Sequence, residues 1–419
     1  MQIKDFIPSS LPLLNYIDSL YSLEGNKPFR NYIILIVQHL LGSSIPFFTM
    51  LEKGGVKSKD VYIVGKAYSS HPLVVNRLIQ KGYRLRFKDV FECMEDQPYD
   101  SILEKHIIQS CRKLFQRIDG NKKGLIIDDG GKAIRLLHEK YPEMVKRFVC
   151  VEQTSRGARI VNKINLKCPV INVARSNAKT FYESPIIAKS MVDELINNIK
   201  FWKKASVFQL INQKVLLLGY GFIGENVANE FRKHGFNIIV YDSDKTQLQK
   251  AYLHGFSIVK KREKAYKFIS ILVGCTGTSA LQEKEFQLLK SGTLLVNMAS
   301  TDTEFSSWKL RSKGEIVYKH VLQSDKKYLQ KLIFIPWRSL YKIQLSKTCI
   351  YLMNGGFPSD FSGKINPVPL ENIQLTQALL LGGAIQAIKT EKSEFIDVDL
   401  KLQKLLIGEY LKLKLYKQS

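Results

Sequence analysis

The most constraining feature of the sequence is a glycine-rich loop in its middle. The apolar run Lys214–Leu218 leads into the loop, a helix-like stretch (residues 225–234) follows it, and a second apolar run, Asn237–Tyr241, comes next. The loop has the pattern Gly-x-Gly-x-x-Gly, which in the order strand, loop, helix, strand is the fingerprint of a dinucleotide-binding unit. Because this context accompanies the pattern, the sequence predicts a Rossmann-type α/β domain around the loop.

Each glycine of the loop has a separate task in such a unit. Gly219 permits the tight turn, Gly221 lets backbone amides approach a pyrophosphate at the helix N-terminus, and Gly224 allows close packing of helix on strand. Asp242 ends the second strand, where a carboxylate accepts hydrogen bonds from an adenosine ribose and repels a 2′-phosphate. These features predict NAD as a cofactor; the alternative is a Rossmann-like unit that has lost its ligand. The predicted NAD contacts here are Gly219, Gly221, Phe222, Ile223, Gly224 and Asp242.

Length and composition are those of a globular protein with more than one domain. The 419 residues suffice for two or three domains, and 45% of them are hydrophobic. Residues 1–5 do not begin a signal peptide, and no stretch reaches the roughly 18 apolar residues of a membrane helix. We therefore expect a cytoplasmic protein without a membrane partner.

The net charge of +25 is large. Neutralisation of phosphates dominates nucleic-acid binding, so such a charge raises that possibility. The basic residues are nevertheless spread along the chain, in modest clusters such as 260–264 and 326–331, and no nucleic-acid-binding motif accompanies them. We interpret the charge mainly as a solvated lysine-rich surface, part of which can serve an anionic substrate or an acidic partner protein. Nucleic acid is not an expected partner.

The six cysteines are scattered, without a Cys-x-x-Cys pair or a neighbouring histidine pattern. This spacing argues against a zinc site and against a disulfide framework. We expect reduced, packed thiols and no metal site.

Short apolar runs alternate with amphipathic segments in both halves of the chain, which predicts two α/β domains. The strands expected in the first 195 residues are Tyr32–Val37, Val61–Val64, Gly124–Asp128, Phe148–Val151 and Val170–Val173. Those expected after the first two strands of the glycine-loop domain are Ser257–Val259, Phe268–Val273, Thr293–Asn297, Glu315–Tyr318 and Lys331–Ile335. A helix over 373–388 is expected to return to the first domain.

Several separated motifs resemble those of the S-adenosylhomocysteine hydrolases. They are, in chain order, Asn26-Lys-Pro28 ahead of a run ending at His39, Ile127-Asp-Asp-Gly-Gly131, Glu152-Gln-Thr154-Ser-Arg-Gly157, Cys168–Val173, Lys179 and the glycine-rich loop. Because they cover most of the chain in the family's order and spacing, the chain is identified as a member of this wider family.

The resemblance implies a reaction in which bound NAD oxidises a ribose 3′-hydroxyl to a ketone. The ketone acidifies the C4′ hydrogen, the 5′-thiol leaves, water adds and the hydride returns. Lys179 would act at the 3′-hydroxyl and Glu183 would stand beside it, whereas Asp129 and His39 would handle the proton of the 5′ leaving group and activate water. The resemblance also implies substrate contacts by Gln153, Thr154, Ser300 and Asn366, and cofactor contacts by Thr154 and Ser155. Thr276 is a further expected cofactor contact, because its loop follows a predicted strand at the ligand edge of the sheet.

The chain departs from the family at several of these positions. Gln153 replaces an acidic residue, Glu183 adds a methylene to an aspartate, and Ser300 and Asn366 replace histidines. The family residues that read adenine after His39 correspond to Leu41 and Ser43. A site built around hydrogen bonds discriminates strongly, so these changes indicate a different base or a different substrate.

Three functions stay open at this point. The first is an NAD-dependent hydrolase acting on S-adenosylhomocysteine or a related nucleoside. The second is an NAD-dependent oxidoreductase or epimerase acting on another nucleoside or sugar, and the third is a catalytically silent NAD-binding regulator.

The expected architecture is a discontinuous substrate-binding domain with an NAD domain inserted into it. We expect the substrate-binding domain in residues 1–195 and 353–390, the NAD domain in 196–352, and a C-terminal tail in 391–419. The family resemblance implies a homo-oligomer, a dimer or a tetramer. The family's C-terminal lysine and tyrosine have no clear counterpart in residues 411–419, which favours the dimer.

Overall fold

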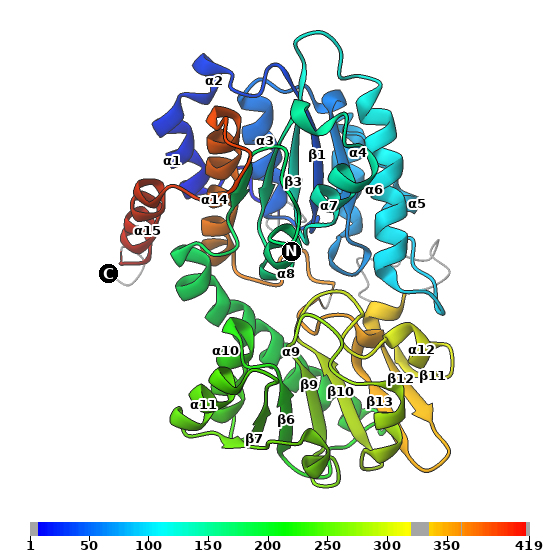
Figure 1. Ribbon diagram of the computed structural model, residues 1–419. Helices are drawn as coiled ribbons and strands as arrows, with labels where there is room; N and C mark the ends of the chain where they lie inside the picture. Colours follow the sequence, from blue (N-terminus) through cyan, green and yellow to red (C-terminus); the bar gives the residue numbers. More distant parts are fainter. Residues whose placement is uncertain (1–6, 320–334, 362, 416–419) are drawn as a thin grey trace. The chain divides into compact units, whose positions relative to one another are not determined.

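The computed structural model describes residues 7–319, 335–361 and 363–415 (Figure 1). Its contacts divide the chain into two compact units. Unit 1 consists of Met1–Glu92, Leu103–Glu183 and Val368–Ser419, and unit 2 of Cys93–Ile102 and Ser184–Pro367. Each unit is built around its own sheet, and both are of the α/β class that the sequence predicts.

Unit 1 contains a six-stranded, fully parallel sheet in the order β14-β5-β4-β3-β1-β2. The strands are β1 (Tyr32–Gln38), β2 (Val61–Gly65), β3 (Lys123–Asp128), β4 (Phe148–Glu152), β5 (Val170–Asn172) and β14 (Phe395–Asp397). The first five are mostly continuous apolar runs rather than alternating ones, as expected of strands that are covered on both faces. The predictions for β1 to β5 were correct within about one residue at each end.

Helices cover both faces of the unit 1 sheet (Figure 1). They are α1 (Pro12–Tyr21), α2 (Leu23–Asn26), α3 (Ser44–Lys53), α4 (Pro72–Gln80), α5 (Phe87–Val90), α6 (Tyr99–Phe115), α7 (Lys132–Lys140), α8 (Ser155–Val161), α14 (Leu370–Lys389) and α15 (Leu400–Leu415). The helix α14 packs against β3, β4 and β5 and beside α1 and α3. It is slightly longer than the helix predicted over 373–388. The helix α15, in the segment expected to be a tail, packs on α14.

Unit 2 contains an eight-stranded sheet in the order β11-β12-β13-β10-β9-β6-β7-β8. The strands are β6 (Lys214–Leu218), β7 (Asn237–Tyr241), β8 (Ser257–Ile258), β9 (Ile271–Gly274), β10 (Thr293–Asn297), β11 (Glu315–Lys319), β12 (Ser339–Gln344) and β13 (Cys349–Leu352). The six strands from β13 to β8 are parallel, whereas β11 and β12 are antiparallel additions at one end. The helices are α9 (Ser184–Lys204), α10 (Phe222–Lys233), α11 (Lys245–Leu253) and α12 (Ser307–Arg311).

The prediction of a strand over Phe268–Val273 was wrong at its start. The strand β9 begins at Ile271, because Phe268 lies in a turn with 59% of its side chain exposed. The hairpin of β12 and β13 was not predicted. The strand expected over Lys331–Ile335 falls almost entirely outside the described residues, and Ile335 itself lies in no strand.

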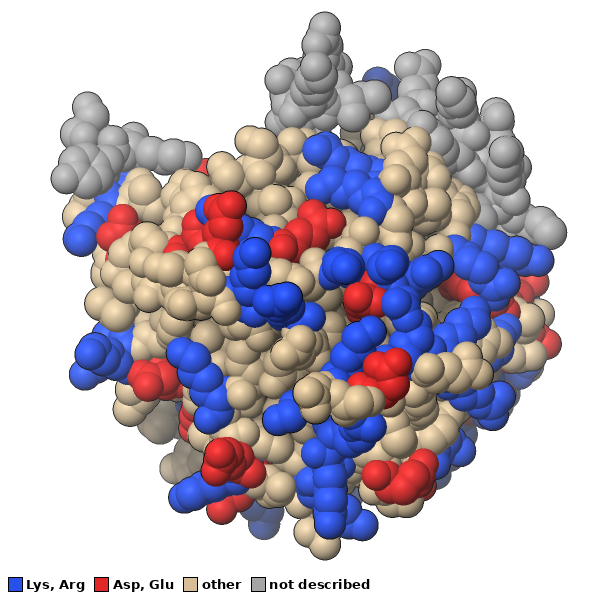
Figure 2. All heavy atoms as spheres, turned by 90° about the horizontal axis from the view of Figure 1, so that it is seen from above, with Lys and Arg blue, Asp and Glu red and all other residues tan. Residues whose placement is uncertain are grey.

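None of the described helices is both long enough and apolar enough to span a membrane. Lysine and arginine side chains are spread widely over the face seen in Figure 2, with acidic side chains among them.

Candidate active site

Four side chains of unit 1 follow directly after four neighbouring strands. His39 comes after β1, Lys66 after β2, Asp129 after β3 and Gln153 after β4. The carboxyl ends of parallel strands meet at one edge of the sheet, and β1 and β3 flank the point where the strand order reverses. In open α/β sheets ligands bind at this edge and near this point, so the sheet itself brings the four side chains together.

Asp129 is the centre of this cluster, with only 4% of its surface exposed. One carboxylate oxygen, Oδ2, lies 3.1 Å from Nε2 of His39 and accepts a hydrogen bond from the amide of Gln153. The other, Oδ1, accepts a hydrogen bond from the ammonium of Lys66. On its far side the His39 ring contacts the hydroxyl of Ser69 through Nδ1.

The charges of the cluster follow from burial and pairing. Burial alone would raise the pKa of Asp129, but Lys66 and His39 together hold this pKa well below its usual range. Burial lowers the pKa of His39, although Asp129 opposes that effect. Near neutral pH the cluster therefore holds an ionised Asp129 and a neutral imidazole, which is the form of histidine that can take up a proton.

Lys66 was missed by sequence reasoning. Its side chain is 3% exposed, which is rare for lysine and occurs where a carboxylate is its partner. The available signal was its position directly after the buried run of β2, at the same sheet edge as His39 and Asp129. Its ammonium donates to Oδ1 of Asp129, and it was not among the predicted residues.

Gln153 belongs to a pair of buried amides. Its Nε2 donates to Oε1 of Gln38 over 3.0 Å, and the amide of Gln38 donates back over 3.2 Å. The side chain that replaces the family's acidic residue is thereby fixed toward Asp129.

The neighbouring Thr154 is held by a buried carboxylate. Its amide and hydroxyl donate to Oε1 of Glu152 over 2.6 and 2.7 Å, and its hydroxyl oxygen caps α8 by accepting from Gly157. Burial raises the pKa of Glu152 well above its ordinary value. Ser155 is the exposed first residue of α8.

Lys179 and Glu183 form a second pair in unit 1. They lie in a π-helical segment, Ala178–Glu183, a type of irregularity that is frequent at functional sites. The ammonium of Lys179 is 3.3 Å from Oε2 of Glu183, and both side chains are 15% exposed. The same carboxylate oxygen accepts a hydrogen bond from Thr376 of α14. The positive charge of Lys179 contributes to the lowered pKa of His39, so the two groups of residues interact electrostatically.

In unit 2 the glycine-rich loop has the geometry that a dinucleotide requires. Gly219 has a φ of +95°, and a Cβ there would lie 2.8 Å from the backbone of Cys275. A Cβ at Gly224 would lie 2.0 Å from the carbonyl oxygen of Gly219, whereas one at Gly221 would meet nothing within 4 Å. Gly221 is the exposed N-cap of α10, so the helix N-terminus is open to an anion.

Asp242 supports the loop from the end of β7. One of its carboxylate oxygens accepts from the amide of Tyr220 over 2.6 Å and the other from that of Asp244 over 2.8 Å. Each oxygen keeps a lone pair for a ribose hydroxyl. The residues present therefore fit a bound NAD.

The remaining predicted residues also lie in unit 2. Thr276 follows β9, and its hydroxyl donates to the fully buried Glu304 over 2.9 Å. Ser300 follows β10, and Asn366 precedes Pro367; both are half-buried. The structure thus joins His39, Asp129 and Gln153 in one cluster, whereas Ser300 and Asn366 belong to the other unit.

Comparisons with known proteins agree with these features. The family model of the S-adenosyl-L-homocysteine hydrolase NAD-binding domain matches residues 189–333. An uncharacterized protein of Mycobacterium tuberculosis is 27% identical over 284 residues, which are 67% of this chain and 53% of that protein. The S-inosyl-L-homocysteine hydrolase of Methanococcus maripaludis is 26% identical over 302 residues, 70% of this chain and 66% of that enzyme.

Among solved structures, the A chain of dipicolinate synthase from Bacillus subtilis is 14% identical with a TM-score of 0.38, covering 85% of this chain and 97% of that one. The chain covers 53% of the length of the Mycobacterium tuberculosis protein and 66% of that of the Methanococcus maripaludis enzyme. The family model, the similarity to the S-inosyl-L-homocysteine hydrolase and the geometry of the glycine-rich loop all support a bound NAD. The chain therefore contains a domain that matches the NAD-binding domain of the S-adenosyl-L-homocysteine hydrolases, has NAD as its cofactor, and is similar to this family as a divergent relative.

Proposed function

We propose that this protein is a hydrolase that cleaves the 5′-thioether of a nucleosyl homocysteine whose base is not adenine. The observation that carries the proposal is the cluster of the buried Asp129 and Lys66 with the half-buried His39, together with the Lys179–Glu183 pair in the same unit. The reaction needs two pairs of residues that transfer protons. A neutral histidine next to an ionised aspartate forms one pair, and a lysine next to a glutamate forms the other. A site without chemistry would have little reason to keep both.

The choice of base rests on Leu41 and Ser43. These residues stand where the family resemblance places the groups that read adenine, and a leucine offers no hydrogen bond to a 6-amino group. A relative of this chain is named an S-inosyl-L-homocysteine hydrolase, and hypoxanthine carries a 6-oxo group in place of the amine. S-inosylhomocysteine is therefore the first substrate to test.

On the 3′ side of the ribose, bound NAD would supply reversible acceptance of a hydride. Lys179 would take the proton of the 3′-hydroxyl. Glu183 would orient the lysine, and Thr376 fixes the glutamate by donating to it.

On the 5′ side, the neutral His39 would take up the acidic C4′ proton and deliver it to the leaving thiolate; in the return steps it would accept a proton from the attacking water and give it back to C4′. Asp129 would orient the imidazole and stabilise its protonated form. Because Lys66 holds Asp129 ionised, we assign Asp129 to positioning His39 rather than to donating protons itself.

The test is to incubate NAD-loaded protein separately with S-inosylhomocysteine and S-adenosylhomocysteine, and to follow NADH absorbance and free thiol together. The proposal predicts both signals, with faster release of thiol from S-inosylhomocysteine than from S-adenosylhomocysteine. Lys179→Ala should remove both signals while NAD stays bound. The matched control is Lys189→Ala, which removes an exposed lysine that also pairs four residues along a helix, with Asp193 at 2.7 Å. The control should behave as the unmodified protein.

NADH without thiol would refute the hydrolase and favour the oxidoreductase or epimerase. Neither signal, with NAD confirmed bound, would contradict an enzyme acting on these nucleosides.

A further inference from the structure

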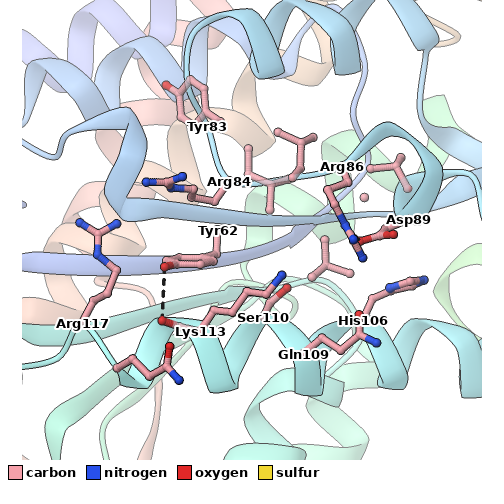
Figure 3. Close-up of a pocket in the computed structure, with 16 residues that line it drawn as sticks. Tyr62, Tyr83, Arg84, Arg86, Asp89, His106, Gln109, Ser110, Lys113 and Arg117 are labelled. Carbon is pink, nitrogen blue, oxygen red and sulfur yellow. Dashed lines mark hydrogen bonds and ion pairs between the residues drawn. The ribbon is translucent and has the colours of Figure 1, made fainter.

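A cavity of about 460 Å³ lies in unit 1 beside the edge strand β2 (Figure 3). Small-molecule sites occupy roughly 300–1,000 Å³, so the cavity has a suitable size for a ligand. Three segments line it, namely β2, residues 83–90, and the helix α6 together with the turn that follows it. None of the residues predicted for catalysis or for NAD is part of this lining.

The lining of the cavity is strongly basic. It contains Arg84, Arg86, Lys113 and Arg117 but a single carboxylate, Asp89. That carboxylate is paired with Arg86, whose Nε lies 2.7 Å from its Oδ2. Neither Arg84 nor Lys113 has a carboxylate partner among the residues that the structure describes. The cavity therefore favours a ligand with several negative charges.

Two of the arginines are held together by one acceptor. Arg84 donates through Nε to the carbonyl oxygen of Lys59 over 3.2 Å, and Arg117 donates to the same oxygen over 2.6 Å. Asp60 fixes Arg117 from its other side. Two adjacent guanidinium groups repel each other, and an anion placed between them would relieve that repulsion while receiving hydrogen bonds from both.

The helix α6 contributes a polar face to the cavity. Residues 106, 109, 110 and 113 of α6 line the cavity, and their spacing of three and four places them on one side of the helix, whereas Gln116 and Arg117 lie in the turn that follows it. Apolar residues of the same helix, including Ile107 and Leu114, are buried in the core of unit 1. The amides of Gln109 and Gln116 and the hydroxyl of Ser110 thus join the cationic groups in the lining.

The arrangement of the charges is elongated. Figure 3 shows Arg84 and Arg117 at one end of the view, Arg86 and Asp89 toward the other, and Lys113 extending between them. A chain of phosphates offers a separate anionic group to each of these cations, whereas a single carboxylate or phosphate offers only one. We propose that this cavity binds the oligophosphate chain of a small molecule, such as a nucleoside triphosphate. This inference is independent of the reaction proposed above.

The test is calorimetric titration of the whole protein with inorganic tripolyphosphate and, separately, with ATP, in metal-free buffer of low ionic strength. Saturating NAD is present so that the glycine-rich loop of unit 2 is occupied. We expect saturable binding at one site per chain. Tighter binding of ATP would mean that the nucleoside also contributes, and equal binding would mean that the phosphates suffice; both results support the proposal.

Two matched variants locate the site. Lys113→Gln removes a cavity cation that has no ion pair in the described part of the chain, and should weaken binding by about tenfold. Arg112→Gln removes the same charge from the next residue of α6, which is exposed and does not line the cavity, and should change binding less than about twofold. Unchanged unfolding curves should accompany both variants.

Absence of saturable binding would overturn the proposal. So would equal weakening by the two variants, which would indicate general attraction to a basic surface. Tighter binding of a short single-stranded RNA than of either phosphate compound, lost in Lys113→Gln, would assign the cavity to nucleic acid instead.

Discussion

The protonation state of Asp129 is set by the residues around it. The aspartate and His39 were predicted from the sequence because they lie in motifs with a family resemblance. Lys66, which sets the charge of Asp129, lies in no such motif, and its role depends on the order of strands in the sheet. Sequence reasoning could therefore propose a proton donor at Asp129, but only the fold reveals that a buried ammonium keeps it ionised.

Replacing Lys66 tests that dependence. Lys66→Met removes the ammonium from a buried ion pair, so we expect the free energy of unfolding to fall by about 3–5 kcal/mol. The same change removes a positive charge that lowers the pKa of His39, so this pKa should rise. Urea denaturation and NMR titration of the His39 ring measure the two effects.

The control for Lys66→Met is Lys132→Met, which breaks a partly buried ion pair of unit 1, between Lys132 and Glu104 at 3.0 Å. It should lower stability without changing the His39 titration. An unchanged His39 titration in Lys66→Met would contradict the account of the cluster.

Asp360 of unit 2 makes stability depend on pH. Burial raises its pKa to about 7, whereas the unfolded chain has a value near 3.9. A pKa that is higher in the folded state means that the stabilisation is complete below about pH 4 and is lost as the pH rises through 7.

Between pH 5 and pH 8 the free energy of unfolding of the natural protein should therefore fall by about 3 kcal/mol more than that of Asp360→Asn, because the asparagine cannot ionise. Urea unfolding at the two pH values measures this difference. The control is Asp96→Asn, at an exposed position, whose free energy of unfolding should fall as much between the two pH values as that of the natural protein. An equal loss in Asp360→Asn would show that another group is responsible.

At the scale of elements, the sequence predicted best where a strand is a buried apolar run. The strands β1 to β7 and β10 were found close to their predicted positions for that reason. The hairpin of β12 and β13 was missed because its strands were not marked by a motif, and they are set by antiparallel pairing with β11 and parallel pairing with β10. The start of β9 was misjudged because Phe268 looks like a strand residue but lies exposed in a turn.

The connection from β6 to α10 gives a prediction that separates folding from cofactor binding. Gly221→Ala places a methyl group where it meets no protein atom but where the pyrophosphate would approach, so NAD affinity should fall with little change in stability. In Gly224→Ala the methyl group collides with the Gly219 carbonyl, so stability should also fall, by roughly 1–3 kcal/mol.

Calorimetric titration with NAD and urea denaturation of both variants measure these outcomes. Normal NAD affinity in Gly221→Ala would contradict the placement of the cofactor at this loop.

At the scale of the whole molecule, the proposed cofactor site and the proposed proton-transfer residues belong to two different sheets. Unit 2 carries the loop that fits NAD, and unit 1 carries the groups that we propose move protons. The presence of both sheets followed from the alternation of apolar and amphipathic segments. The basic cavity beside β2 was beyond sequence reasoning, because its charges come from separate segments that only the fold brings together.

The most direct test of the central claim is solvent exchange at the C4′ carbon of the nucleoside. The NAD-loaded protein is incubated with S-inosylhomocysteine in deuterium oxide, and deuterium at C4′ is measured by NMR and mass spectrometry. Oxidation at the 3′ position makes the C4′ hydrogen acidic, so the account predicts deuterium at C4′ with the natural protein and none with Lys179→Ala. No deuterium with the natural protein while NAD is bound, or equal deuterium with both proteins, would contradict it.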